Sequence, residues 1–182
     1  FYLGRKNVTV NGKILFIYRT KFGLKAMDKL AKISPKFLKG VGFVGVIVGF
    51  LSMAALFLFL IYYTLLLFIR PGTPAALAPL LPGLRIHGLP VLPFWFFIIS
   101  VFFIIIVHEF AHGVFARLYN LKIKSSGLVF LGPLPGAFVE PDEKKMSKAS
   151  AKAQLSILSA GSFANVVLFL VIFLISIFIL SP

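Results

Sequence analysis

The stretch Ile104-Ile105-Ile106-Val107-His108-Glu109-Phe110-Ala111-His112-Gly113 decides how the chain folds, because it joins an apolar run to a His-Glu-x-x-His motif. In a helix, residues four apart share a face, so His108 and His112 point the same way and Glu109 lies beside them. Neutral imidazoles bind Zn²⁺, which lowers the pKa of a bound water to about 7 so that a carboxylate can take its proton. The motif predicts a zinc site with His108 and His112 as ligands and Glu109 as the base.

The flank of the motif predicts where this site lies. Residues 93–107 carry no charge, and the helical pattern continues to about Leu118, which is long enough to cross a bilayer. Ionisable side chains are costly in such a segment and usually serve a function there. The alternative is a polar cluster that only joins helices, but Ser, Thr and Asn are the usual residues for that purpose.

The composition of the chain predicts an integral membrane protein. Hydrophobic residues make up 59% of the chain, against about 45–50% in soluble proteins. The absence of cysteine excludes disulfides and thiolate ligands, which leaves imidazole and carboxylate. The net charge is +14, but Lys and Arg flank apolar segments and form no separate basic domain. This pattern favours anionic lipid as a partner over nucleic acid.

Residues 1–40 are predicted to form a cytoplasmic basic segment. Two β-prone runs flank Asn11-Gly12, which predicts a hairpin. Residues 21–39 then predict an interfacial amphipathic helix with a break at Ser34-Pro35, although a solvated basic linker is an alternative. The chain begins with Phe1 and an apolar residue run, which we interpret as the start of a fragment.

Residues 41–182 are predicted to form the membrane core. Residues 41–69 and 153–180 carry no charge, so with residues 93–118 they give three transmembrane helices. Ten of the nineteen Lys and Arg precede Val41 and seven lie between Arg117 and Lys152. By the positive-inside rule both regions are cytoplasmic, and the site opens to that side through a polar cleft.

Residues 125–141 are apolar, but Gly and Pro interrupt them and they are too short to span. They predict one or two strands with a tight turn, placed directly after the active-site helix. A free strand edge can hold an extended peptide, and structural packing is the alternative. The fold class is therefore mainly α, a polytopic membrane protein of three transmembrane helices with a short β segment.

Three further positions are candidates for site residues. Gly161 and Asn165 lie four residues apart in the third span, so one helix face offers close approach and an amide, although helix packing alone also explains the pattern. His87 lies in the proline-rich stretch between the first two spans, where a lone histidine is usually a surface residue, so we leave it out of the site.

Three motifs together resemble one known family. They are residues 108–113, the run Gly132-Pro-Leu-Pro-Gly-Ala-Phe-Val-Glu-Pro141, and the Gly-x-x-x-Asn pattern of Gly161 and Asn165. From about Thr20 to Ile179 the chain resembles the site-2 protease family of intramembrane zinc metalloproteases, particularly its archaeal branch. The resemblance implies cleavage of a transmembrane protein substrate in the plasma membrane of a prokaryote. It also implies Glu109 as general base and acid, and Asn165 with Gly161 in binding substrate or the oxyanion.

Two alternatives from other classes stay open. A prenyl-protein or stress-type membrane metalloprotease shares the His-Glu-x-x-His motif but takes a downstream Glu as third ligand. A membrane scaffold or metal-transport module would bind metal without catalysis.

The third zinc ligand is not evident in the sequence. A catalytic zinc takes three protein ligands, and the motif supplies two. Of the remaining acids Glu140 is the least implausible, and the resemblance implies instead an Asp on a further helix beyond Pro182. We therefore expect residues 1–182 alone to bind zinc weakly and to show no proteolysis.

Overall fold

The computed structural model describes residues 8–11, 15–70, 72–73, 82–83, 91–132 and 134–180. His87 lies outside these residues. In chain order the elements are β1 (Val8–Asn11), β2 (Leu15–Thr20), α1 (Leu24–Ile33), α2 (Pro35–Ile69), α3 (Phe94–Leu118), β3 (Ile123–Leu131), β4 (Leu134–Pro141), α4 (Glu143–Ser147) and α5 (Ala151–Leu180).

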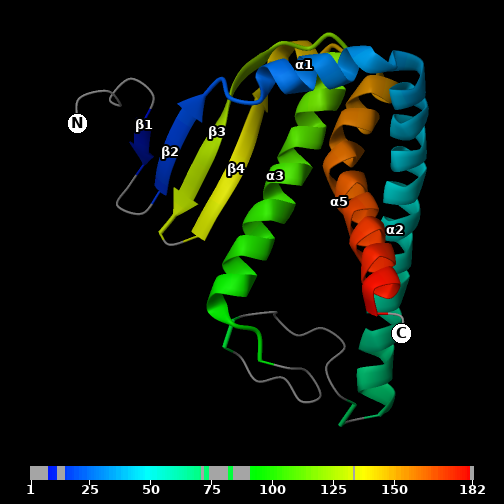
Figure 1. Ribbon diagram of the computed structural model, residues 1–182. Coiled ribbons are helices and arrows are strands. Elements are labelled where there is room, and N and C mark those ends of the chain that lie inside the picture. Colours follow the sequence, from blue (N-terminus) through cyan, green and yellow to red (C-terminus); the bar gives the residue numbers. More distant parts are fainter. Residues whose placement is uncertain are drawn as a thin grey trace.

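Three helices, α2, α3 and α5, are long and apolar enough to cross a membrane. Their most apolar windows have mean hydropathies of 2.7, 2.3 and 3.0. Helix α5 packs against both α2 and α3, and the sheet lies on the other side of α3 (Figure 1). Large side chains such as Phe57 and Phe178 are 63% and 87% exposed, which suits contact with lipid rather than water. The predicted fold class is confirmed.

Small residues allow α2 to approach α5 closely. A Cβ atom at Gly42 would lie 2.7 Å from the Phe115 ring and 3.2 Å from the Ser156 side chain. Gly42 is buried at this contact, so any larger residue would push the helices apart.

The two predicted hairpins form a single antiparallel sheet in the order β1-β2-β3-β4. Strand β2 pairs with β3 from Leu15↔Leu131 to Thr20↔Ser126. A hairpin was predicted around Asn11-Gly12 and one or two strands after the active-site helix, but the pairing of β2 with β3 was not. The division of the chain at residue 40 stays a prediction, although β2 and β3 come from opposite sides of it and α2 continues across it.

Helix α1 packs across the end of the bundle where α3 ends (Figure 1). Its Met27 and Ala31 are buried in the core, so the segment is a packed helix rather than a linker. Asp28 of α1 forms an ion pair with Arg117 of α3, with 2.9 Å between Asp28 Oδ1 and Arg117 Nε. Helix α1 ends before Ser34, as predicted, and Pro35 begins α2.

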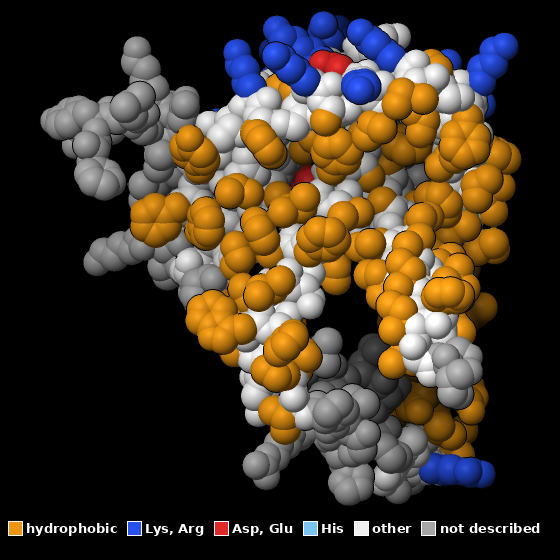
Figure 2. Space-filling view, in the orientation of Figure 1, with side chains coloured by type: hydrophobic (Ala, Val, Ile, Leu, Met, Phe, Trp, Pro, Cys, Tyr) orange, Lys and Arg blue, Asp and Glu red, His pale blue; other side chains and the backbone are white. Residues whose placement is uncertain are grey.

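Lys and Arg side chains gather at this same end of the molecule (Figure 2). On the face shown in Figure 2, apolar side chains largely cover the surface below this end. A charged end above an apolar body matches the boundary between a lipid headgroup region and hydrocarbon.

Candidate functional site

The two histidines of the motif lie one turn apart on α3 and face α5. Their Nε2 atoms are 3.1 Å apart. Two nitrogens bound at 2.0–2.1 Å to a tetrahedral zinc would lie about 3.4 Å from each other. The pair therefore needs a shift of only a few tenths of an ångström to fit one zinc ion.

Helix α5 holds both imidazole rings. His112 Nδ1 lies 2.6 Å from the Ile157 carbonyl oxygen. Because a carbonyl only accepts, Nδ1 carries the proton and Nε2 keeps the lone pair that a metal needs. His108 Nδ1 lies 3.1 Å from the amide nitrogen of Asn165.

Gly161 brings the α5 backbone against the same two rings. A Cβ atom there would lie 2.5 Å from His108 Nε2 and would also clash with His112 Nε2. A side chain at this position would thus fill the space in front of the two Nε2 lone pairs, and glycine leaves that space free. The structure brings together His108, His112, Gly161 and Asn165, and their roles stay predictions.

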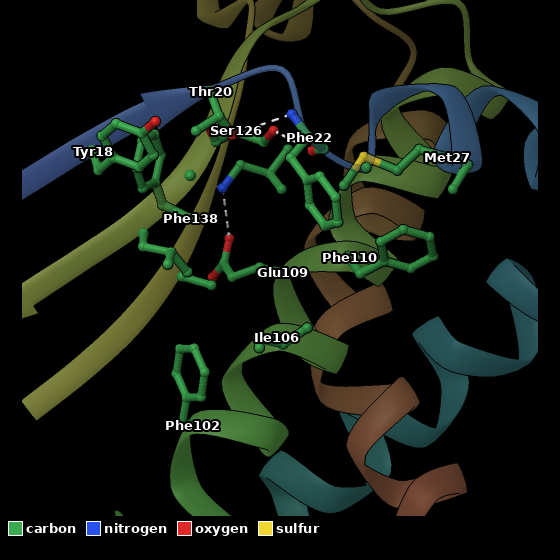
Figure 3. Close-up of a pocket in the computed structure, with 16 residues that line it drawn as sticks. Tyr18, Thr20, Phe22, Met27, Phe102, Ile106, Glu109, Phe110, Ser126 and Phe138 are labelled. Atoms are coloured by element: carbon green, nitrogen blue, oxygen red, sulfur yellow. Dashed lines mark hydrogen bonds between the residues drawn. The ribbon is translucent and has the colours of Figure 1, made fainter. Parts of the chain in front are cut away.

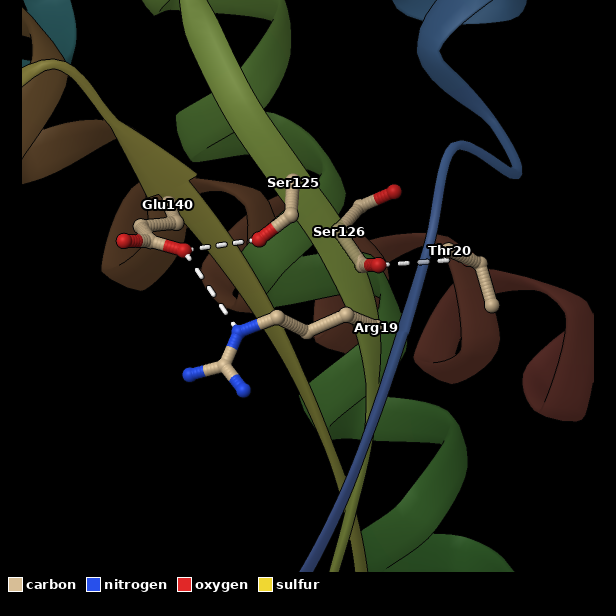
Figure 4. Close-up of polar contacts among 5 residues, drawn as sticks. All are labelled: Arg19, Thr20, Ser125, Ser126 and Glu140. Carbon is tan, nitrogen blue, oxygen red and sulfur yellow. Dashed lines mark hydrogen bonds and ion pairs between the residues drawn. The ribbon is translucent and has the colours of Figure 1, made fainter. Parts of the chain in front are cut away.

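The described residues contain no group of three His, Cys, Asp or Glu side chains that could hold a metal. Glu140, the acid weighed as a third ligand, has other partners. It accepts a hydrogen bond of 2.7 Å from Ser125 Oγ, and its Oε2 lies 4.0 Å from Arg19 Nε (Figure 4). The donor set near the histidines fits a zinc site of which these residues supply two ligands.

Glu109 points toward the sheet rather than toward α5. Its Oε2 accepts a hydrogen bond of 3.2 Å from the backbone N–H of Val139 (Figure 3). Val139 lies on β4. Because its N–H donates to Glu109, this N–H points away from β3 and belongs to the edge of β4 that does not pair with β3. By strand alternation the same edge carries Ala137, and Pro135 and Pro141, which have no N–H. The free edge of β4 therefore offers two backbone N–H donors beside Glu109, those of Ala137 and Val139.

A cavity of about 710 Å³ opens beside this edge, between α1, α3 and the sheet (Figure 3). Its lining is mainly apolar and includes Phe102, Ile106 and Phe138. Glu109 is the charged residue in that lining. Tyr18 and Phe22 also line the cavity, and no sequence pattern predicted this, because their positions depend on the pairing of β2 with β3.

These features are typical of one class of protein. A His-Glu-x-x-His motif on a helix apolar enough to span a membrane, with both histidines held by a second such helix, is typical of membrane metallopeptidases. Residues 96–181 match the model of peptidase family M50. This match runs from α3 through α5, and over this stretch the resemblance to the site-2 protease family is confirmed.

A similar protein occurs in Methanocaldococcus jannaschii and is described as uncharacterized. It is 38% identical over 170 residues, which cover 90% of this chain and 43% of that relative. The chain thus spans less than half the length of the relative it matches. No solved structure matches the chain.

Proposed function

We propose that the protein is a zinc metalloprotease that cleaves a peptide bond of a membrane-embedded protein substrate. The observation that carries the proposal is the spacing of 3.1 Å between the Nε2 atoms of His108 and His112 on a membrane-spanning helix. The family of residues 96–181 supports the same reaction class.

The chemistry requires a proton acceptor beside the metal site. A bound zinc ion would polarise the scissile carbonyl and lower the pKa of the attacking water. Glu109 would take the proton from that water and deliver it to the leaving amine. The expected parts of Asn165 and Gly161 in binding substrate or the oxyanion belong to this proposal.

The free edge of β4 is the proposed place for an extended substrate. A peptide strand beside β4 would accept hydrogen bonds from the N–H groups of Ala137 and Val139. Because Glu109 now accepts from Val139 N–H, an incoming strand would replace it there and free its carboxylate for proton transfer. The apolar cavity beside the edge suits the apolar side chains of a membrane segment.

The basic end of the molecule supports a proposed orientation. Exposed lysines such as Lys25, Lys29 and Lys32 on α1 would face anionic lipid headgroups at the cytoplasmic surface. The site would then open to the cytoplasm of a prokaryote, below the plasma membrane surface.

The substitution Glu109→Gln tests the proposal. It removes the proton acceptor but leaves both imidazoles, so zinc content should match wild type while cleavage of a membrane substrate falls by at least about 100-fold. Glu140→Gln is the matched control, because Glu140 bonds to Ser125 and not to the site, and it should keep cleaving. Undiminished processing by Glu109→Gln would sink the proposal and favour a scaffold or metal-transport module.

A further inference from the structure

The hydrogen bonds around the two histidines form one directed chain. His112 Nδ1 donates to the Ile157 carbonyl, so His112 Nε2 carries a lone pair. His108 Nε2 lies 3.1 Å away, and a hydrogen bond across this distance requires that His108 Nε2 carry the proton. His108 Nδ1 then carries a lone pair of its own, which accepts from the Asn165 amide nitrogen at 3.1 Å.

This direction of the hydrogen bonds leaves one side-chain atom of Asn165 without a partner. Asn165 Oδ1 is buried and has no hydrogen-bond partner among the described residues. Buried polar atoms in proteins are usually paired, so an unpaired one calls for an explanation. Oδ1 is a spare acceptor, and a half-turn of the planar amide group brings it to the place of the nitrogen, against His108 Nδ1.

Metal binding requires the other tautomer of His108, and so the opposite direction of its hydrogen bond with Asn165. Both Nε2 atoms need a free lone pair to ligate one ion, so the proton of His108 has to lie on Nδ1. A protonated Nδ1 needs an acceptor, and the amide nitrogen of Asn165 cannot accept.

We propose that Asn165 is a positioning residue that sets the tautomer of His108. Its amide nitrogen donates to Nδ1 in the metal-free site, and its Oδ1 accepts from Nδ1–H when both Nε2 atoms ligate zinc. The ring stays neutral in this exchange, because Nε2 loses one proton and Nδ1 gains one. The inference rests on the proposed function, and it gives Asn165 a role at the metal ligand rather than at substrate or the oxyanion.

Selective ¹⁵N labelling of the imidazoles reads the tautomer of each ring, and loss of signals in a His108→Asn variant assigns those of His108. The experiment uses the protein in detergent micelles, with and without Zn²⁺. We expect His108 to be protonated at Nε2 without zinc and at Nδ1 with zinc. Asn165→Asp presents only acceptor atoms, so it should fix the Nδ1–H tautomer without zinc and keep zinc affinity at the wild-type value or tighter.

Asn165→Leu removes both the donor and the acceptor, so its zinc dissociation constant should rise by about 10–100-fold. Ser162→Leu, at an exposed position of the same helix, is the control for an added apolar side chain and should leave zinc affinity unchanged. Equal zinc affinity in wild type, Asn165→Leu and Asn165→Asp overturns the inference and leaves the proposed function standing. A wild-type protein that binds no zinc refutes the proposed function, and the metal-free spectra of wild type and Asn165→Asp then decide on the hydrogen-bond direction alone.

Discussion

Single residues set the geometry of the histidine pair. His108 and His112 share a helix face because they are four residues apart, but the orientation of each ring depends on one contact with α5. Gly161 adds a third contact that only glycine permits, since a Cβ atom there would clash with both rings. The site is thus sensitive to changes of a single methyl group on α5.

We expect Gly161→Ala to displace the two imidazoles, because the added Cβ would need the space that they fill. Zinc affinity should fall by at least about tenfold, a loss like that of other changes that misplace ligands. Zinc titration of the purified protein measures the effect. The control is Ser162→Ala, one residue along at an exposed position, which should bind zinc as wild type does. Unchanged zinc affinity in Gly161→Ala would show that the ligands lie elsewhere.

At the scale of elements, β4 connects the sheet to the active-site helix. It is paired with β3 along one edge, and its other edge faces Glu109 through the Val139 N–H. Pro135 and Pro141 limit the donors on that edge to the two residues between them, Ala137 and Val139. The element thus has one edge that stabilises the fold and one that is open to a substrate.

We expect Ala137→Pro to weaken substrate binding, because it removes an N–H that points away from β3 and so leaves the sheet pairing in place. The KM for a membrane substrate should rise about fivefold to tenfold, as expected for one lost hydrogen bond of about 1 kcal/mol. Ala137→Val keeps the N–H and suits a strand, so it should cleave with nearly the wild-type KM. A wild-type KM in Ala137→Pro would exclude the edge of β4 as the place where the peptide binds.

The whole molecule is polarised, with basic side chains at the end that holds α1 and an apolar surface along the spans (Figure 2). The ion pair between Asp28 and Arg117 and the burial of Met27 fix α1 to that end. Positive charge at the cytoplasmic face is the general rule for membrane proteins. This polarity therefore predicts which side of the membrane α1, β3 and the site opening face.

The absence of cysteine makes this orientation testable with single-cysteine variants. A cysteine at Lys124, exposed on β3, should react with a membrane-impermeant thiol reagent only after the cells are opened. Arg70→Cys, at the opposite end of α2, should react in intact cells. Labelling of Lys124→Cys from outside intact cells would reverse the proposed topology and the cytoplasmic opening of the site.

Features that depend on local patterns could be predicted from the sequence alone. Uncharged apolar runs predicted the three spans, the four-residue spacing placed both histidines on one face, and turn residues predicted the first hairpin and the strands after α3. Three contacts are evident only in the folded protein: β2 pairs with β3, Glu109 meets the edge of β4, and Asn165 meets His108 across 57 residues of chain. The physical reason is that periodicity and turn chemistry act between near neighbours in the chain. The distant pairings depend instead on how whole elements pack together, and no single segment records that packing.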